Sequence, residues 1–283
     1  MKKILITGAN SYIGTSFENY IKSFDGYQIN TVDMIDGSWR NKDFSGYDVV
    51  FHVAGIAHSD VKTPDEETIK KYYQINTDLT VETAIKAKSD GVNQFIFMSS
   101  MIVFGSHNEC ITFETKPEPD NFYGNSKLQA DIKIHELQND SFNVVSLRPP
   151  MIYGKGSKGN YPKLAKLACK TPVFPNFKNR RSMLYIENLC EFLRLIIDNN
   201  ENGYFYPQNS EYVNTSNMVK TISEVYGKNI ILTRIFNPFI YLLKNNAIIK
   251  KVFGDMYYIK EMSSYKQEYN VCGFAESIRR TEG

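Results

Sequence analysis

Short apolar runs alternate with longer amphipathic stretches over the first 150 residues. The apolar runs predict buried strands at residues 4–6, 27–33, 49–53, 94–98 and 143–147. Apolar positions at helical spacing predict helices between them, one that begins near residue 13 and two over residues 66–88 and 122–137. Strands that alternate with helices of this length are typical of βαβ units, so we predict an α/β fold with a parallel sheet.

The alternation fades after residue 150. Residues 151–182 are rich in Gly, Lys, Asn and Pro, which predicts loops around one short helix at residues 164–169. Further helices are expected near residues 187–198, 218–226 and 239–252. We therefore expect a sheet domain over residues 1–150 and a smaller, mostly helical lobe over residues 151–283, intertwined with the first.

Composition and charge exclude several classes of protein. The 283 residues are 42% hydrophobic and 23% charged, which is enough apolar material for a full core. A formal net charge of +2 shows no basic excess, so we expect no nucleic-acid partner. The four cysteines stand far apart and are typical of reduced thiols in the cytoplasm. No uncharged apolar run reaches about 18 residues, so we expect no transmembrane segment.

A glycine turn follows the first strand directly, from Gly8 to Gly14. Such a turn lets main-chain N–H groups approach a pyrophosphate at the N-terminus of the next helix. We therefore expect cofactor contacts from the turn residues Gly8, Asn10, Ser11, Tyr12, Ile13 and Gly14. Ser11 stands where turns of this type have their middle glycine. An ordinary connection between a strand and a helix remains the alternative.

Asp33 stands at the end of the second predicted strand, 19 residues after Gly14. A carboxylate there accepts hydrogen bonds from an adenosine ribose and repels a 2′-phosphate, which favours NAD over NADP. Arg40 and Lys42 follow closely and could neutralise a phosphate. The expected cofactor is therefore NAD(H) or NADP(H).

A serine, a tyrosine and a lysine form the second candidate site. The strand at residues 94–98 ends in Ser99 and Ser100, at the sheet edge where ligands bind in parallel α/β proteins. Tyr123 and Lys127 are four residues apart and lie on one helix face. An adjacent ammonium favours phenolate, so we expect Lys127 to lower the pKa of Tyr123 for proton exchange. With 19 tyrosines in the chain, a Tyr and a Lys four residues apart also arise by chance. This pair follows the glycine turn and the serines at the strand end in that order, which favours a functional interpretation.

Six segments together resemble the extended short-chain dehydrogenase/reductase family, in its NAD-dependent epimerase/dehydratase group that acts on nucleotide sugars. They are TGANSYIG at 7–14, HVAG at 52–55, FIFMSSMIVFG at 95–105, YGNSK at 123–127, LRPPMIYG at 147–154 and RSMLYIENL at 181–189. The resemblance implies a Rossmann-type doubly wound sheet that binds NAD(P) over residues 1–150, a substrate-binding lobe over residues 151–283, and a homodimer.

The resemblance also implies a role for individual residues. Tyr123 is implied as the catalytic acid/base, Lys127 as its partner that also binds the nicotinamide ribose, and Ser100 as the hydroxyl that binds the substrate's C4 oxygen. The positions implied along the cofactor are His52, Ala54, Gly55, Pro150 and Met151. The positions implied at the substrate are Asn76, which supports the active site, and Asn160 and Arg181, which bind the sugar or its diphosphate.

Two further features have simpler interpretations. His52 lies in an apolar strand, which favours a core histidine, and His58, His107 and His135 lack metal-binding partners at useful spacing, so we expect no metal site. The apolar segment 234–253 could rest on a membrane surface or pack as a helix on the lobe or in a dimer. Asparagines and Pro238 interrupt any clean amphipathic face, which favours packing.

Three hypotheses on function remain. The first is NAD(P)H-dependent reduction of the C4 ketone of a UDP-4-keto-6-deoxy-N-acetylhexosamine, to UDP-FucNAc or UDP-QuiNAc, in bacterial surface polysaccharide synthesis. The second is an NAD-dependent UDP-sugar 4-epimerase, and the third is a non-catalytic NAD(P)-binding scaffold or sensor. The intact Ser100, Tyr123 and Lys127 argue against a scaffold. Residues 147–189 resemble capsule and O-antigen reductases more than UDP-galactose 4-epimerases, so we favour reduction.

Overall fold

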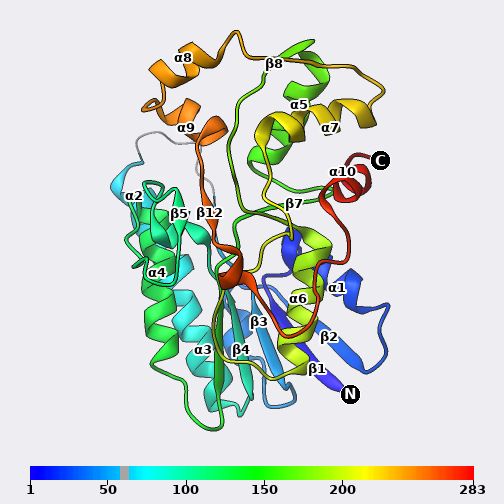
Figure 1. The fold of residues 1–283 in the computed structure, drawn as a ribbon. Helices are drawn as coiled ribbons and strands as arrows, with labels where there is room; N and C mark the ends of the chain where they lie inside the picture. Colours follow the sequence, from blue (N-terminus) through cyan, green and yellow to red (C-terminus); the bar gives the residue numbers. More distant parts are fainter. Residues whose placement is uncertain (58–63) are drawn as a thin grey trace.

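A six-stranded parallel sheet with helices on both faces forms the larger part of the molecule, and a smaller lobe lies beyond the carboxyl ends of its strands (Figure 1). The computed structural model describes residues 1–57 and 64–283, so His58 lies outside the described residues. The predicted doubly wound α/β fold is confirmed.

The sheet strands are β1 (Lys2–Thr7), β2 (Tyr27–Val32), β3 (Val49–His52), β4 (Gln94–Met98), β6 (Asn143–Leu147) and β10 (Gly203–Phe205). Their order is β10-β6-β4-β3-β1-β2, and all neighbours are parallel. The order changes direction between β1 and β3, and this is where parallel sheets bind ligands beyond their strand ends. The five predicted strands are confirmed, whereas β10 was not predicted.

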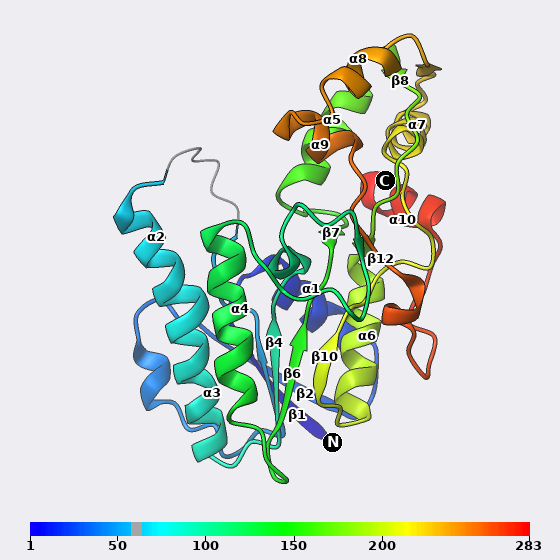
Figure 2. The same ribbon diagram turned by 60° about the vertical axis from the view of Figure 1, so that its left-hand side comes forward.

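Helices cover both faces of the sheet (Figure 2). One face carries α1 (Tyr12–Ile21) and α6 (Ile186–Asp198), and the other carries α2 (Glu66–Tyr73), α3 (Leu79–Ser89) and α4 (Phe122–His135). Side chains alternate along each strand, so Ile4 and Ile6 enter one core and Leu5 enters the other. The helix predicted over residues 66–88 is observed as α2 and α3 joined by a π-helical turn, Gln74–Asp78.

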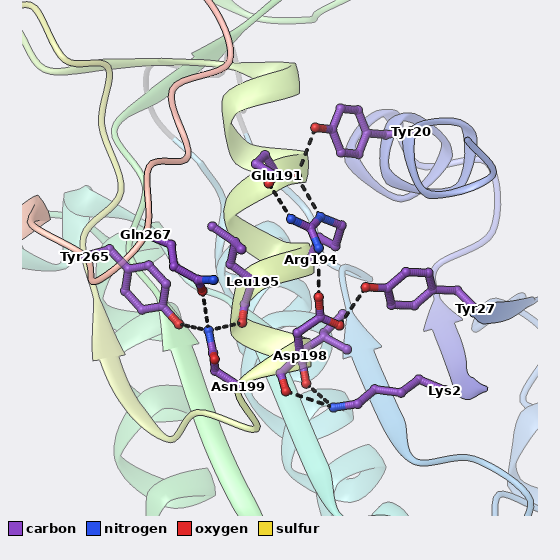
Figure 3. A network of polar contacts seen from close by, with 11 residues as sticks. Lys2, Tyr20, Tyr27, Glu191, Arg194, Leu195, Asp198, Asn199, Tyr265 and Gln267 are labelled. Atoms are coloured by element: carbon purple, nitrogen blue, oxygen red, sulfur yellow. Dashed lines mark hydrogen bonds and ion pairs between the residues drawn. The ribbon is translucent and has the colours of Figure 1, made fainter. Parts of the chain in front are cut away.

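Helix α6 follows residue 150 in the sequence but packs on the sheet domain (Figure 3). Tyr20 Oη of α1 donates to Glu191 at 3.0 Å, and Tyr27 Oη of β2 donates to Asp198 at 2.6 Å. Arg194 joins these two carboxylates of α6 at 2.6 Å and 2.8 Å. Both α6 and β10 therefore complete the sheet domain from the second part of the chain. The domain boundary at residue 150 stays a prediction.

The lobe contains five helices and short parallel strand pairs. Its helices are α5 (Asn160–Lys170), α7 (Thr215–Val225), α8 (Asn237–Leu242), α9 (Ala247–Phe253) and α10 (Phe274–Glu282). The strand pairs are β7 (Met151–Tyr153) with β9 (Met183–Tyr185), β8 (Val173–Pro175) with β11 (Ile231–Thr233), and β5 (Cys110–Ile111) with β12 (Tyr257–Tyr258). Short 3-10 turns occur at Ser38–Asn41, Met101–Phe104 and Lys260–Ser263.

Two predictions for this part of the chain were wrong. Residues 151–182 hold the strands β7 and β8 as well as a helix that begins at Asn160. The single helix expected over residues 239–252 is two short helices, because the side chain of Asn246 accepts the main-chain N–H of Ile248 and starts α9 afresh.

Within the described ranges 1–57 and 64–283, no helix is long and apolar enough to cross a bilayer. The same residues contain no cluster of three His, Cys, Asp or Glu side chains suited to a metal ion. All four cysteines are free thiols.

Replacement of Phe192 by alanine tests how much the packing of α6 against β10 and the C-terminal segment contributes to stability. Its ring packs edge-on against Phe205 of β10, Tyr265 and Tyr269, with centroids 4.7–5.9 Å apart. We expect Phe192→Ala to lower the free energy of unfolding by about 3–5 kcal/mol, because it leaves a buried cavity. Urea denaturation measures this loss. The exposed Phe113→Ala is the control and should change stability by less than about 0.5 kcal/mol; equal losses would contradict the prediction.

Candidate active site

The glycine turn packs tightly against the loop that follows β3. Gly8 has a φ of +98°, and a Cβ added there would lie 2.8 Å from the main-chain nitrogen of Ala54. Both the backbone conformation and this approach require glycine. Ser11 needs no such freedom, since its φ is −69° and its Oγ accepts the N–H of Gly14 at 3.1 Å. The serine thus caps α1 in place of a middle glycine.

The start of α1 directs its first N–H groups and the positive end of the helix dipole toward the switch point of the sheet. Tyr12 and Ile13 are the first residues of this helix, and Asn10 before it adopts a left-handed conformation with a φ of +63°. This arrangement can hold a pyrophosphate, as the sequence predicts.

Asp33 follows the last residue of β2 and is exposed at the sheet edge. One carboxylate oxygen accepts the N–H of Ile35 at 2.8 Å. Arg40 is held elsewhere, because its guanidinium forms a bidentate pair with Glu82 and lies 4.7 Å from the ring centroid of Trp39. One of the two nearby cations that we considered as phosphate ligands, Arg40, is thus already paired with a carboxylate.

Lys127 lies in the interior of the site, one helical turn after Tyr123. Asn121 caps α4 by accepting the N–H of Gly124 at 2.8 Å, and this fixes the start of the helix. Lys127 Nζ donates to the main-chain oxygen of Met98 at 2.9 Å and lies over the ring of Phe97. Burial lowers the pKa of Lys127 to about 8, although the nearby Asp131 carboxylate acts in the opposite direction.

Tyr123 is not acidified as we expected. Burial raises its pKa to about 12, and a hydrogen bond with the Ser100 side chain only partly opposes this effect. The Lys127 ammonium, which we expected to stabilise the phenolate, donates to Met98 instead. Tyr123 is therefore a protonated phenol near neutral pH, and in this state it can donate a proton but cannot accept one.

Asn76 joins three elements behind the catalytic group. It lies fully buried in the π-helical turn, and such turns are frequent at functional sites. Its amide exchanges two hydrogen bonds with the main chain of Ile56, at 2.9 Å and 3.0 Å, and donates to Ser126 Oγ at 3.1 Å. A Cβ added at Gly55 would lie 3.1 Å from both Asn76 Oδ1 and Lys127 Nζ. Asn76 thus positions the loop after β3, and its contact with substrate stays a prediction.

His52 is a core residue, as its strand predicts. Its ring nitrogens are hydrogen-bonded to the hydroxyls of Thr7 at 2.7 Å and Thr80 at 3.1 Å. Burial lowers its pKa to about 3, so the imidazole is neutral at physiological pH.

A buried carboxylate beneath the site was missed by the sequence analysis. Asp131 accepts hydrogen bonds from Ser99 Oγ and from Arg148 Nε, both at 2.9 Å. The guanidinium of Arg148 also lies over the rings of Phe104 and Tyr204. The spacing offered a signal, because Asp131 is four residues after Lys127 and falls on the same helix face.

The remaining predicted positions lie around this group. Ala54 borders the glycine turn, and Pro150 is buried just beyond the carboxyl end of β6. Asn160 begins α5 in the lobe. Arg181 is also in the lobe, where its Nη1 donates to the main-chain oxygen of Gly254 at 2.9 Å and burial lowers its pKa. Their roles toward cofactor and substrate stay predictions.

The described residues fit a dinucleotide cofactor. Glycines stand at two places where a side chain would fill the space beside the strand ends, Gly8 against Ala54 and Gly55 against Lys127. Between them the start of α1 offers N–H donors, and Asp33 offers an acceptor at the far edge. This arrangement matches the pyrophosphate and ribose groups of NAD.

Comparisons with known proteins agree with this geometry. The NAD dependent epimerase/dehydratase family model matches residues 4–207. A UDP-glucose 4-epimerase of Vibrio cholerae is 30% identical over 80% of this chain and 76% of its own length. An N-acetyl-alpha-D-glucosaminyl-diphospho-ditrans,octacis-undecaprenol 4-epimerase of Escherichia coli O157:H7 is 27% identical over 71% of this chain and 65% of its own length.

Solved structures include both reaction types. A UDP-glucuronic acid 4-epimerase of Bacillus cereus in complex with NAD has a TM-score of 0.76 at 17% identity, and covers 99% of this chain and 97% of its own. A dTDP-4-dehydrorhamnose reductase of Bacillus anthracis in complex with NADP has a TM-score of 0.74 at 18% identity, with 99% of both chains covered. The shared fold therefore does not distinguish an epimerase from a reductase.

Asp131→Asn tests the electrostatic link to Lys127. Removal of the carboxylate should move the pKa of Lys127 below about 8, because the negative charge favours the ammonium. It should also lower the free energy of unfolding by about 3–5 kcal/mol, because Arg148 loses its buried partner. NMR titration of labelled lysine side chains, with Lys127→Met to assign the signal, measures the first effect.

The exposed Asp140→Asn serves as the control for this variant and should leave the lysine titration unchanged. A pKa of Lys127 that is the same in Asp131→Asn as in the wild type would exclude the link.

Proposed function

We propose that this protein reduces a C4 ketone. The chain belongs to the NAD dependent epimerase/dehydratase family, and it is an enzyme that acts on nucleotide sugars with NAD(H) or NADP(H). The proposed substrate is a UDP-4-keto-6-deoxy-N-acetylhexosamine, and the product is UDP-FucNAc or UDP-QuiNAc for bacterial surface polysaccharide. The carrying observation is the grouping of Ser100, Tyr123 and Lys127, in which Tyr123 is a protonated phenol.

Each catalytic residue has one task in this proposal. When bound, a reduced nicotinamide cofactor would supply the hydride that C4 of the sugar accepts. Tyr123 donates its phenolic proton to the C4 oxygen, which converts the ketone to an alcohol. Ser100 donates a hydrogen bond to the same oxygen and holds it near the phenol. Lys127, whose ammonium is held by the main chain of Met98, would stabilise the remaining tyrosinate through its positive charge and not through a hydrogen bond, until solvent returns the proton.

Residues at the strand ends are proposed to hold the cofactor. The turn from Gly8 to Gly14 would bind the pyrophosphate, and Ala54, Gly55 and Pro150 would lie along the nicotinamide half. Lys127 would also bind the ribose next to the nicotinamide. Asp33 would bind the adenosine ribose, and the pairing of Arg40 with Glu82 supports a preference for NAD(H) over NADP(H).

The lobe is proposed to bind the nucleotide part of the substrate. The planar guanidinium of Arg181 suits a diphosphate, and Asn160 lies at the start of α5 on the same lobe. Asn76 would support the sugar end through the loop after β3. We further propose that the enzyme works in the cytoplasm as a homodimer.

A 4-epimerase is the second candidate, because two of the relatives found by sequence carry that name. An epimerase begins with oxidation at C4, and Tyr123 must then accept a proton. We favour reduction because residues 147–189 resemble capsule and O-antigen reductases more than UDP-galactose 4-epimerases.

The reaction can be assigned by absorbance at 340 nm. Purified protein with NADH, and a UDP-4-keto-6-deoxy-N-acetylhexosamine made in place by a dehydratase, should lose one NADH per ketone. Conversion of UDP-GlcNAc to UDP-GalNAc without added cofactor, and no loss of NADH, would instead identify an epimerase. Silence in both assays would contradict both proposed substrates and leave the identity of the nucleotide sugar open.

Tyr123→Phe should lower turnover by at least about a hundredfold, because the ring keeps its packing but loses the proton donor. Tyr73→Phe is the matched control. The Tyr73 hydroxyl on α2 donates to Asn125, which is on α4 with Tyr123, and it has no part in the proposed step. Circular dichroism checks that both variants fold. Normal turnover in Tyr123→Phe would remove this residue from the mechanism.

Asp33→Ala should reduce the preference for NADH over NADPH, since the carboxylate that repels a 2′-phosphate is gone. The ratio of kcat/KM for the two cofactors measures this preference. An unaltered ratio would show that another residue selects the cofactor.

A further inference from the structure

The helices α8 and α9 form an exposed apolar surface at the end of the lobe. The side chains of Ile235, Phe239, Leu242, Leu243 and Ile248 all face solvent, and Leu242 is 80% exposed. We call these five residues the apolar tip. The tip lies at the pole of the molecule opposite the N-terminus (Figures 1 and 2). Exposed apolar patches of this kind commonly mark interaction sites.

The tip is held in place by the lobe beneath it. Ile240 and Phe253 are buried, and the ring of Phe253 packs against Phe174 and Phe177 with centroids 5.7 Å and 5.6 Å apart. The ring of Tyr241 also packs against Phe177, with centroids 5.1 Å apart. The fold thus buries one side of α8 and α9 and leaves the apolar tip outside.

The chain around the tip carries charge of one sign. Residues 149–186 and 227–254 contain thirteen Lys and Arg and no Asp or Glu, although the whole protein has a net charge of only +2. Lys244, between α8 and α9, and Lys251, in α9, are exposed. Lys178 and Arg234 are exposed as well. These two stretches of the lobe are therefore basic, whereas its carboxylates lie on other segments, such as Glu224 of α7 and Glu276 and Glu282 of α10.

We propose that the apolar tip docks on the surface of an anionic lipid bilayer. Apolar side chains on short helices can enter the boundary between headgroups and acyl chains, while lysines and arginines beside them contact lipid phosphates. This mode needs no spanning helix. A symmetric contact between two copies is less suited to the surface, because it would bring two segments rich in Lys and Arg together.

Co-sedimentation with vesicles tests the proposal without any need for turnover. The intact protein should bind vesicles of phosphatidylglycerol and phosphatidylethanolamine, and bind less to phosphatidylcholine alone. Phe239→Ser combined with Leu242→Ser should weaken binding at least about tenfold, because both side chains lose apolar contact with lipid. Phe113→Ser is the matched control, since Phe113 and Phe239 are 65% and 64% exposed and Phe113 is not part of the apolar tip.

A second variant tests the charge without change to the apolar side chains. Lys244→Gln combined with Lys251→Gln should weaken binding to the anionic vesicles, and added salt should do the same to the wild type. Absence of wild-type binding, or equal binding by the tip variants, would overturn the proposal. It would also fail if sedimentation showed a dimer that Phe239→Ser with Leu242→Ser dissociates, because the tip would then be a contact between copies.

Discussion

The buried carboxylate of Asp131 is the interaction on which the arrangement of the candidate active site depends. It lies on α4 and binds Ser99 at the end of β4 and Arg148 at the end of β6. These contacts set the height and rotation of the helix above the strand ends. Because Tyr123 and Lys127 are on the same helix, the placement of α4 also fixes where these two residues lie relative to the strand ends. A charge in the core is costly unless it is paired, so the pair resists any shift of α4.

The electrostatics of the site follow from that placement. Lys127 is inserted so deeply that its ammonium meets the main chain of Met98. Burial then governs both titrating groups, and it lowers the pKa of the lysine while raising that of the tyrosine. The helical spacing of Tyr123 and Lys127 was predictable from sequence. The partner of the ammonium was not, because it is a main-chain oxygen on another element.

Much of the sheet domain could be predicted from sequence, because its strands are apolar runs with clear ends. The strand β10 was missed, since Gly203–Phe205 is too short to show a pattern and gains its place by pairing with β6. The π-helical turn around Asn76 was also missed, because helical periodicity does not reveal one extra residue in a turn. In the lobe, the apolar content of residues 239–252 predicts one continuous helix, but Asn246 caps a new helix and divides the segment into α8 and α9.

The entry of β10 and α6 into the sheet domain bears on how the chain folds during synthesis. The whole glycine turn and the predicted catalytic residues are made early, yet α6, which packs against α1, ends at Asp198, and the edge strand ends at Phe205. One face of the sheet and one edge therefore stay uncovered until about three quarters of the chain has left the ribosome. The lobe segments made in between must emerge before the sheet is closed, so the two parts cannot fold as independent units in order of translation.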